Sequence, residues 1–133
     1  RVQCAIWWML PAAFISRPAA FATGEEETMS VPIGIESLNY EFPGHRPAGQ
    51  FAPVLVGVVG SGNMEVMLEP ASTSTCRFAV QTSARGFGAI WEAVLRDFQQ
   101  RHGLAGVSVS INDMGATPAV VSLRLAQAAA EIE

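Results

Sequence analysis

The sequence predicts an α+β fold: a two-layer sandwich in which a mostly antiparallel, five-stranded sheet is covered on one face by two helices. In most strand-like segments between residues 38 and 81, apolar and polar side chains alternate, which is the pattern of a half-buried strand. After Ser83 the apolar side chains recur at helical spacing, and one further alternating segment separates two such helical segments. The predicted order is therefore β-β-β-β-α-β-α, in which helices cover the apolar face of strands whose other face is polar.

The length and composition indicate one globular domain. The chain has 133 residues, of which 50% are hydrophobic and 15% are charged, so it can form a modest core and is too apolar for a disordered protein. Its 12 acidic and 8 basic residues give a net charge of −4, which argues against binding nucleic acid by neutralising phosphates. The two cysteines, Cys4 and Cys76, have the spacing of neither a metal site nor a disulfide framework.

Residues 1–28 are predicted to lie outside the folded domain, which we expect to occupy residues 29–133. The sequence Gly-Glu-Glu-Glu-Thr-Met at residues 24–29 must be encoded by a purine-rich stretch that runs into a methionine codon. A bacterial ribosome-binding site and start codon have this form. We therefore expect residues 1–28 to be translated upstream sequence and Met29 to be the true start.

A secretory signal is the alternative for this segment. An apolar run from Ala5 to Phe14 is followed by Ala20-Phe21-Ala22, which imitates a small-residue cleavage site. Pro11 and Arg17 interrupt the segment, however. The apolar stretch around Trp7-Trp8 is also too short to span a membrane.

Four strands are expected in the first half of the domain. Leu38–Phe42 alternates apolar and polar residues and ends before a Pro-Gly pair. Val54–Val59 is apolar nearly throughout, which predicts a central strand. Met64–Glu69 and Cys76–Gln81 alternate again, so the methionines of the former are expected to serve packing. A buried and unreactive thiol is expected at Cys76.

The rest of the chain predicts a helix, a fifth strand and a second helix. The first helix ends before Gly103, a typical helix stop, and the alternating segment Val107–Asn112 follows. Thr117 and Pro118 are a typical N-cap and first-turn pair for the second helix. The residues expected to pack against the sheet are Phe87, Ile90, Trp91, Val94, Leu95 and Phe98 on the first helix and Val121, Leu125, Ala128 and Ile132 on the second.

The segment Gly60-Ser61-Gly62-Asn63 separates two apolar strands and predicts a β-hairpin with Ser61 at its tip. Gly and Asn tolerate the positive φ that a tight hairpin needs. A serine held in solvent by two strands, with glycines beside it that leave room for a large group, is an accessible handle for attachment. By shape alone, an ordinary solvated turn remains the alternative.

Three better-known glycine motifs do not fit this loop. A phosphate-binding P-loop needs Lys and Ser or Thr where Asn63 and Met64 stand, and the chain contains no lysine. A dinucleotide-binding fingerprint needs a glycine in place of Glu65 and a helix after it. A hydrolase nucleophile elbow needs glycines in place of Val59 and Asn63. Ser61 is therefore not interpreted as a nucleophile.

The other residues that can carry chemistry form no catalytic arrangement in the sequence. His45 lies in a Pro/Gly loop and His102 at a helix C-terminus, and neither has an obvious carboxylate or nucleophile partner. Asp113 is expected to form a turn, and Arg77 and Arg85 are expected on the surface, where they could hold a phosphate or a carboxylate. No paired carboxylates, metal cluster or triad emerges, so a self-sufficient enzyme is not expected.

Several segments together resemble the acyl carrier (delta) subunit of malonate decarboxylase and, more distantly, the carrier (gamma) subunit of citrate lyase. The similarity covers about Leu38 to Ile132. The segments that carry it are Leu38–Pro43, Val56–Val66, Val80–Ser83, Gly115–Val121 and Leu123–Leu125.

The resemblance implies a covalent cofactor. In that family the serine between the two glycines carries phosphoribosyl-dephospho-coenzyme A through a phosphodiester bond, so Ser61 is the implied attachment residue and Gly60, Gly62 and Asn63 form its loop. The family usually has Asp at the position of Asn63. Asn keeps the turn geometry, but it could alter recognition by the enzyme that attaches the arm.

The resemblance also implies the partners and the cycle. An acyl transferase subunit exchanges acetyl for malonyl on the thiol of this coenzyme A-like arm, and decarboxylase subunits then release carbon dioxide and regenerate the acetyl thioester. A prosthetic-group transferase attaches the arm, the location is cytoplasmic, and neither a membrane nor nucleic acid is involved. The carrier itself needs no catalytic residue. Two alternatives remain: a module that binds a protein or ligand through Gly60–Asn63 with Ser61 unmodified, and an enzyme that uses His102 or Asp113.

Overall fold

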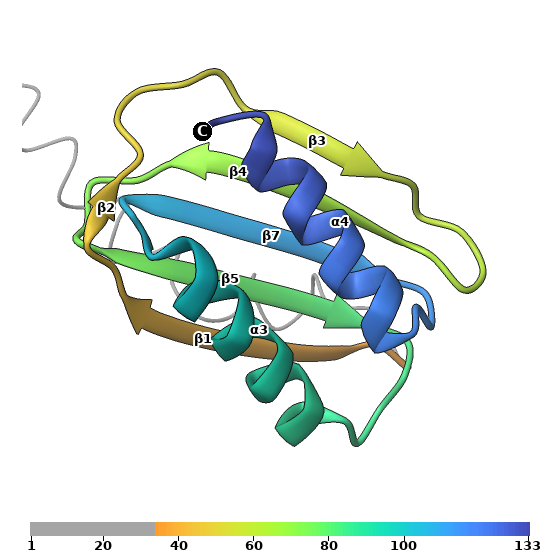
Figure 1. Cartoon of the computed structure of the whole chain (residues 1–133). Coiled ribbons are helices and arrows are strands. Elements are labelled where there is room, and N and C mark those ends of the chain that lie inside the picture. The colour runs from red at the N-terminus through yellow and green to blue at the C-terminus, as the bar shows by residue number, and fades with distance from the viewer. Residues whose placement is uncertain (1–33) are drawn as a thin grey trace, which may run out of the picture. The chain divides into compact units, whose positions relative to one another are not determined.

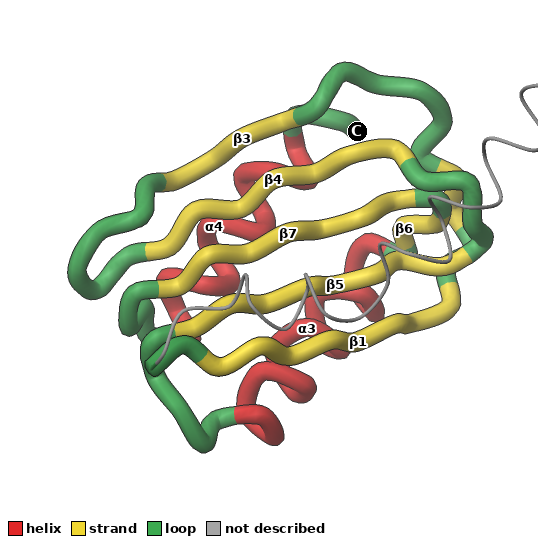
Figure 2. Tube along the Cα trace, turned by 180° about the vertical axis from the view of Figure 1, so that it is seen from behind, coloured by secondary structure: helices red, strands yellow, loops and turns green. Residues whose placement is uncertain are grey.

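Five strands form one twisted sheet, and two helices pack on one of its faces (Figure 1). The computed structural model describes residues 34–133, so the prediction that residues 1–28 are translated upstream sequence lies outside the described residues. Seen from the other side, the strands follow one another across the sheet with both helices behind them (Figure 2). The predicted two-layer α+β fold is therefore confirmed.

The sheet has the order β1-β5-β7-β4-β3. Every pair of neighbours is antiparallel except β5 and β7, which are parallel because a helix connects them. The strands of the sheet are β1 (Glu36–Pro43), β3 (Val54–Gly57), β4 (Met64–Pro70), β5 (Thr75–Thr82) and β7 (Val107–Asp113). The helices are α3 (Gly88–His102) and α4 (Pro118–Ala130). Two short strands that were not predicted, β2 (Arg46–Pro47) and β6 (Leu104–Ala105), form a separate parallel pair.

The prediction that Val54–Val59 forms a central strand is wrong. In the structure β3 ends at Gly57 and lies at the edge of the sheet, because β7 inserts between β4 and β5 and occupies the centre. Leu55 pairs with Met67 on the face of the sheet that no helix covers, and it is 60% exposed. The strand stops at Gly57 because this glycine has a φ of +88°, and a Cβ at this position would overlap the carbonyl oxygen of Met64.

The core lies between the helices and the inner face of the sheet, and the predicted alternation of β4, β5 and β7 supplies it. The inward side chains of these strands are fully buried. Their helical partners include Trp91, Leu95 and Phe98 on α3 and Val121, Leu125 and Ala128 on α4, as predicted. Burial of one such side chain stabilises the fold by roughly 1.5–3 kcal/mol. Two predicted members of the α3 stripe, Phe87 and Ile90, are instead exposed.

The predicted helix boundaries are confirmed by their caps. Gly103 has the left-handed conformation and donates its N–H to the carbonyl oxygen of Gln99 at the end of α3. Thr117 accepts a hydrogen bond from the N–H of Val120 at 3.3 Å, and Pro118 follows it in the first turn of α4. Within residues 34–133, neither helix has the length and apolar character needed to cross a membrane.

Candidate functional site

Ser61 is exposed and belongs to the loop that joins β3 to β4. This loop extends beyond one end of the sheet (Figure 1). Ser61 and Gly62 occupy the two central positions of a turn that is closed by a hydrogen bond from the N–H of Asn63 to the carbonyl oxygen of Gly60, at 2.9 Å. Gly62 has a φ of +71°, as the third residue of a type II turn requires. Since β3 already ends at Gly57, the loop is longer than the four-residue connection Gly60–Asn63 that the sequence predicted.

The space around Ser61 is open. A Cβ placed on Gly62 would meet no heavy atom within 4 Å, and one on Gly60 would meet only Val58, at 4.0 Å. Both neighbours of the serine therefore leave room for a large group, whether it is a substituent on the hydroxyl or an approaching protein.

The loop is tied to the rest of the molecule by backbone and side-chain hydrogen bonds. The N–H of Gly62 donates to the carbonyl oxygen of Met114 at 2.8 Å, and the N–H of Met114 donates to the carbonyl oxygen of Asn63 at 3.0 Å. The side-chain oxygen of Asn63 accepts from the N–H of Met64 at 2.8 Å and from Nε of Arg124 at 3.3 Å. Ser61 is thus presented by a loop that is supported by the residue directly after β7 and by α4.

Asp113 stabilises the turn that follows it in the sequence, in agreement with the prediction that this residue forms a turn. Its side chain is only 2% exposed. One carboxylate oxygen accepts from the hydroxyl of Thr82 at 2.7 Å, and the other accepts from the N–H of Ala116 at 2.9 Å. These two bonds connect the ends of β5 and β7 to the segment that leads into α4.

His102 is the last residue of α3 and His45 directly precedes β2, and both of these segments lie at the end of the sheet opposite the β3–β4 loop (Figure 1). His102, at the C-terminus of α3, contacts a carboxylate oxygen of Glu133 through Nδ1 at 2.7 Å, a partner that the sequence did not reveal. The ring of His45 packs against Gly103. The structure therefore brings neither imidazole to the serine. Within residues 34–133, no cluster of His, Cys, Asp and Glu has the geometry of a metal site.

The two candidate arginines lie apart from each other. Arg77 projects from the helix-free face of the sheet and pairs with Glu41 at 3.1 Å. The hydroxyl of Thr75 and the Arg77 guanidinium together lower the pKa of Glu41. Arg85 is exposed in the loop between β5 and α3, at the same end of the sheet as Ser61.

The buried residues behave as predicted. Met64 is fully buried in the core, while Met67 is half-buried on the helix-free face. Cys76 is also fully buried, and burial raises the pKa of its thiol to about 12.

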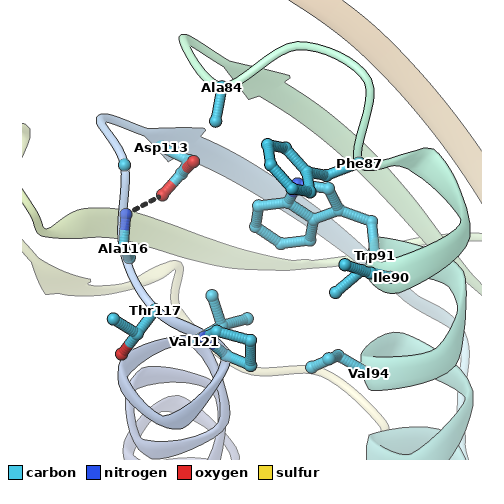
Figure 3. A pocket seen from close by; sticks show the side chains of 11 residues that line it. Ala84, Phe87, Ile90, Trp91, Val94, Asp113, Ala116, Thr117 and Val121 are labelled. Atoms are coloured by element: carbon cyan, nitrogen blue, oxygen red, sulfur yellow. Dashed lines mark hydrogen bonds between the residues drawn. The ribbon is translucent and has the colours of Figure 1, made fainter.

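A pocket of about 300 Å³ opens between the N-terminal ends of α3 and α4, and the sequence did not predict it. Figure 3 shows the rings of Phe87 and Trp91 along one wall and Val121 of α4 opposite. Its remaining lining residues are Ala84, Ile90, Val94, Asp113, Gly115, Ala116, Thr117 and Pro118. Only one feature of the sequence relates to this pocket, namely the apolar stripe of α3. This stripe extends beyond the part of α3 that α4 covers.

Comparisons with known proteins agree on one family. A family model described as malonate decarboxylase delta subunit matches residues 52–132. The chain is 73% identical over 103 residues to the malonate decarboxylase acyl carrier protein of Burkholderia cepacia, covering 77% of this chain and 95% of the relative. It is 56% identical over 97 residues to that of Stenotrophomonas maltophilia strain K279a, covering 71% and 91%.

A solved structure supports the same assignment. One chain of a Pseudomonas malonate decarboxylase hetero-tetramer in complex with malonate superposes with a TM-score of 0.68 at 39% identity, covering 74% of this chain and 99% of that chain. The fold and the sequence therefore lead to the same conclusion: the chain belongs to the malonate decarboxylase delta-subunit family of acyl carrier proteins.

Proposed function

We propose that this chain is the acyl carrier subunit of a cytoplasmic malonate decarboxylase complex, and that Ser61 holds phosphoribosyl-dephospho-coenzyme A through a phosphodiester bond. The observation that carries the proposal is the geometry of the loop. Ser61 is exposed at the tip of a turn, both of its glycine neighbours open onto free space, and the turn is hydrogen-bonded to the body of the protein.

The residues around Ser61 fit such a group. A phosphodiester on the serine is anionic, and Arg124 is the cation whose Nε already contacts the loop, through the side chain of Asn63. Gly60 and Gly62 leave the hydroxyl accessible to the enzyme that attaches the group. When bound, the group supplies a thiol on which acyl groups are carried as thioesters.

The role of the chain's own residues is to hold and present the arm. Fixing the arm on a rigid loop raises the effective concentration of the acyl group at each partner, and this requires no acid, base or nucleophile from the carrier. The proposed partners are the acyl transferase subunit, the decarboxylase subunits and the prosthetic-group transferase. The likeness to one chain of a hetero-tetramer that was solved with malonate supports an assembly of this kind.

Replacement of Ser61 tests the proposal in the reconstituted complex. Ser61→Ala leaves the turn intact, because the closing hydrogen bond is made by the backbone. It is expected to reduce the release of carbon dioxide from malonate to the background of a complex without the carrier. Ser74→Ala, at an exposed serine of the loop between β4 and β5, is the matched control and should retain full activity. Retained activity in Ser61→Ala would favour the alternative, in which the loop binds a partner without modification.

A further inference from the structure

The pocket between α3 and α4 has the properties of a ligand site. Its volume of about 300 Å³ is at the lower end of the range for small-molecule sites. Phe87 and Ile90 line it, yet they are 48% and 46% exposed, although both lie on the apolar stripe of α3. Large apolar side chains left exposed around a concave surface indicate a binding partner that covers them.

The pocket combines aromatic walls with polar acceptors at one end. The rings of Phe87 and Trp91 form the wall on the α3 side, and the carboxylate of Asp113 lies toward Ala116 (Figure 3). Each carboxylate oxygen of Asp113 accepts one hydrogen bond and retains capacity for another. A flat aromatic ligand that carries an amino group suits this combination, because its face can stack on the rings while its N–H groups donate to the acceptors.

The pocket lies close to Ser61. Gly62 is hydrogen-bonded to Met114, and Met114 is flanked in the sequence by two lining residues, Asp113 and Gly115. With about 3.8 Å between consecutive Cα atoms and about 5.5 Å across a hydrogen-bonded pair, the Cα of Ser61 lies within roughly 13 Å of that of Gly115. Gly115 has no side chain, and no atom lies within 4 Å of where its Cβ would be, so this residue leaves space on the turn for the linker.

We propose that the pocket binds the adenine base of the arm attached to Ser61, which folds back over the Met114–Gly115 turn. This inference rests on the proposed function. In phosphoribosyl-dephospho-coenzyme A, the phosphoribosyl unit next to the serine leads to the adenosine, and the diphosphate and pantetheine with the thiol extend beyond it. About ten bonds of roughly 1.5 Å join the serine oxygen to the base nitrogen, and because the chain of bonds is not fully extended, the distance is on the order of 10 Å.

Tethering makes a weak site sufficient. A short covalent linker gives an effective concentration in the millimolar range, so a pocket with millimolar affinity for the free base is occupied for much of the time. Binding the base fixes the part of the arm near the protein and leaves the thiol end free to reach the partner subunits. The segment that swings between active sites is then the pantetheine portion rather than the whole arm.

Nuclear Overhauser contacts test the inference in the loaded protein. The full chain is labelled with ¹³C and loaded by co-expression with its prosthetic-group transferase, and its intact mass is measured on the same sample. We expect contacts from adenine H2 and H8 to the methyl groups of Ile90, Val94 and Val121. A loaded sample whose adenine shifts equal those of free dephospho-coenzyme A, with no such contacts, would overturn the inference and leave the proposed function standing. An unloaded Ser61 in an active complex would overturn the proposed function instead.

A titration of the unmodified chain with dephospho-coenzyme A tests the pocket independently of loading. Saturable shifts are expected at the indole N–H of Trp91 and at the Ile90 methyl group. Ile90→Ser should raise Kd about fivefold through the loss of roughly 40 Å² of apolar contact. Leu123→Ser, at a similarly exposed apolar residue of α4 outside the pocket, should leave Kd unchanged. Shifts that are absent at millimolar ligand, or equal effects of the two variants, would contradict the assignment.

Discussion

The N–H of Gly62 donates a hydrogen bond to the carbonyl oxygen of Met114 at 2.8 Å, although 52 positions separate the two residues in the sequence. This bond and its partner from Met114 to Asn63 join the loop that contains Ser61 to the end of β7. β7 is the central strand of the sheet, and Met114 follows directly after its last residue, Asp113, so the loop with the serine is anchored where the central strand ends. A position that is exposed and yet well fixed is what an attachment point for a mobile arm requires.

Replacement of Gly62 should destabilise the protein. Its φ of +71° costs an L-residue about 1 to 2 kcal/mol, so Gly62→Ala should lower the free energy of unfolding by that amount. Urea denaturation of the purified chain measures it. Gly60→Ala is the matched control: Gly60 does not have a positive φ and has open surroundings, so a change within about 0.5 kcal/mol is expected. Equal losses in the two variants would contradict the turn assignment.

Asn63→Asp should preserve the loop and strengthen its contact with α4. The carboxylate can accept the same bonds from Met64 and Arg124, and the ion pair with Arg124 should add about 0.5 kcal/mol to stability. Salt should screen this gain. Asn63→Ala removes both acceptor contacts and should cost about 1 kcal/mol. Denaturation at low and high salt distinguishes the variants, and a salt-independent gain in Asn63→Asp would argue against the ion pair.

Loss of the Asp113 carboxylate should loosen the turn next to Ser61. Asp113→Ala leaves the Ala116 N–H without its acceptor and the Thr82 hydroxyl with only the longer contact to the carbonyl oxygen of Ala84, at 3.4 Å, which should cost about 2 kcal/mol. Asn112→Ala, at the adjacent exposed position of β7, should change stability by less than about 0.5 kcal/mol. Hydrogen exchange adds a local test, because the Gly62 amide should lose protection in Asp113→Ala. Unchanged protection there would show that the two turns are not coupled.

The Cys76 thiol should stay unreactive in the folded protein. Burial raises its pKa to about 12, so the reactive thiolate is scarce at pH 8, and the side chain has no access to solvent. Incubation with a thiol-specific reagent, followed by peptide mapping, should find Cys76 unmodified in buffer and fully modified in denaturant. Labelling in buffer on the timescale of minutes would contradict the buried position. This inertness would also allow the thiol of an attached arm to be labelled without interference from Cys76.

Local periodicity explains why most elements could be predicted. The alternation in β4, β5 and β7 and the apolar stripes of the helices each lie within one segment, and the caps at Thr117 and Gly103 are set by a few neighbouring residues. The position of β3 could not be predicted in the same way. Whether an apolar run lies at the centre or the edge of a sheet depends on which distant strand pairs with it, and the chain inserts β7 next to β4.

In the candidate site, too, the features set by neighbouring residues could be predicted, and those set by distant segments could not. The exposure of Ser61 follows from its own turn, which the glycines beside it specify. The support from Met114 and the pocket beside Phe87 depend on how β7, α3 and α4 are placed in space, so no short motif records them. The two exposed residues at the start of the α3 stripe were interpreted as core, because periodicity shows which face of a helix is apolar but not how far its neighbour extends.

Mass spectrometry of the subunit shows whether the arm is attached to Ser61. The subunit is purified from cells that also supply its partner enzymes. Its intact mass gives the size of any modification, and the peptides from a protease digest give its position. We expect a mass increase equal to phosphoribosyl-dephospho-coenzyme A linked by a phosphodiester, located on the peptide that contains Ser61 and absent in Ser61→Ala. An unmodified Ser61 in a complex that decarboxylates malonate would contradict it.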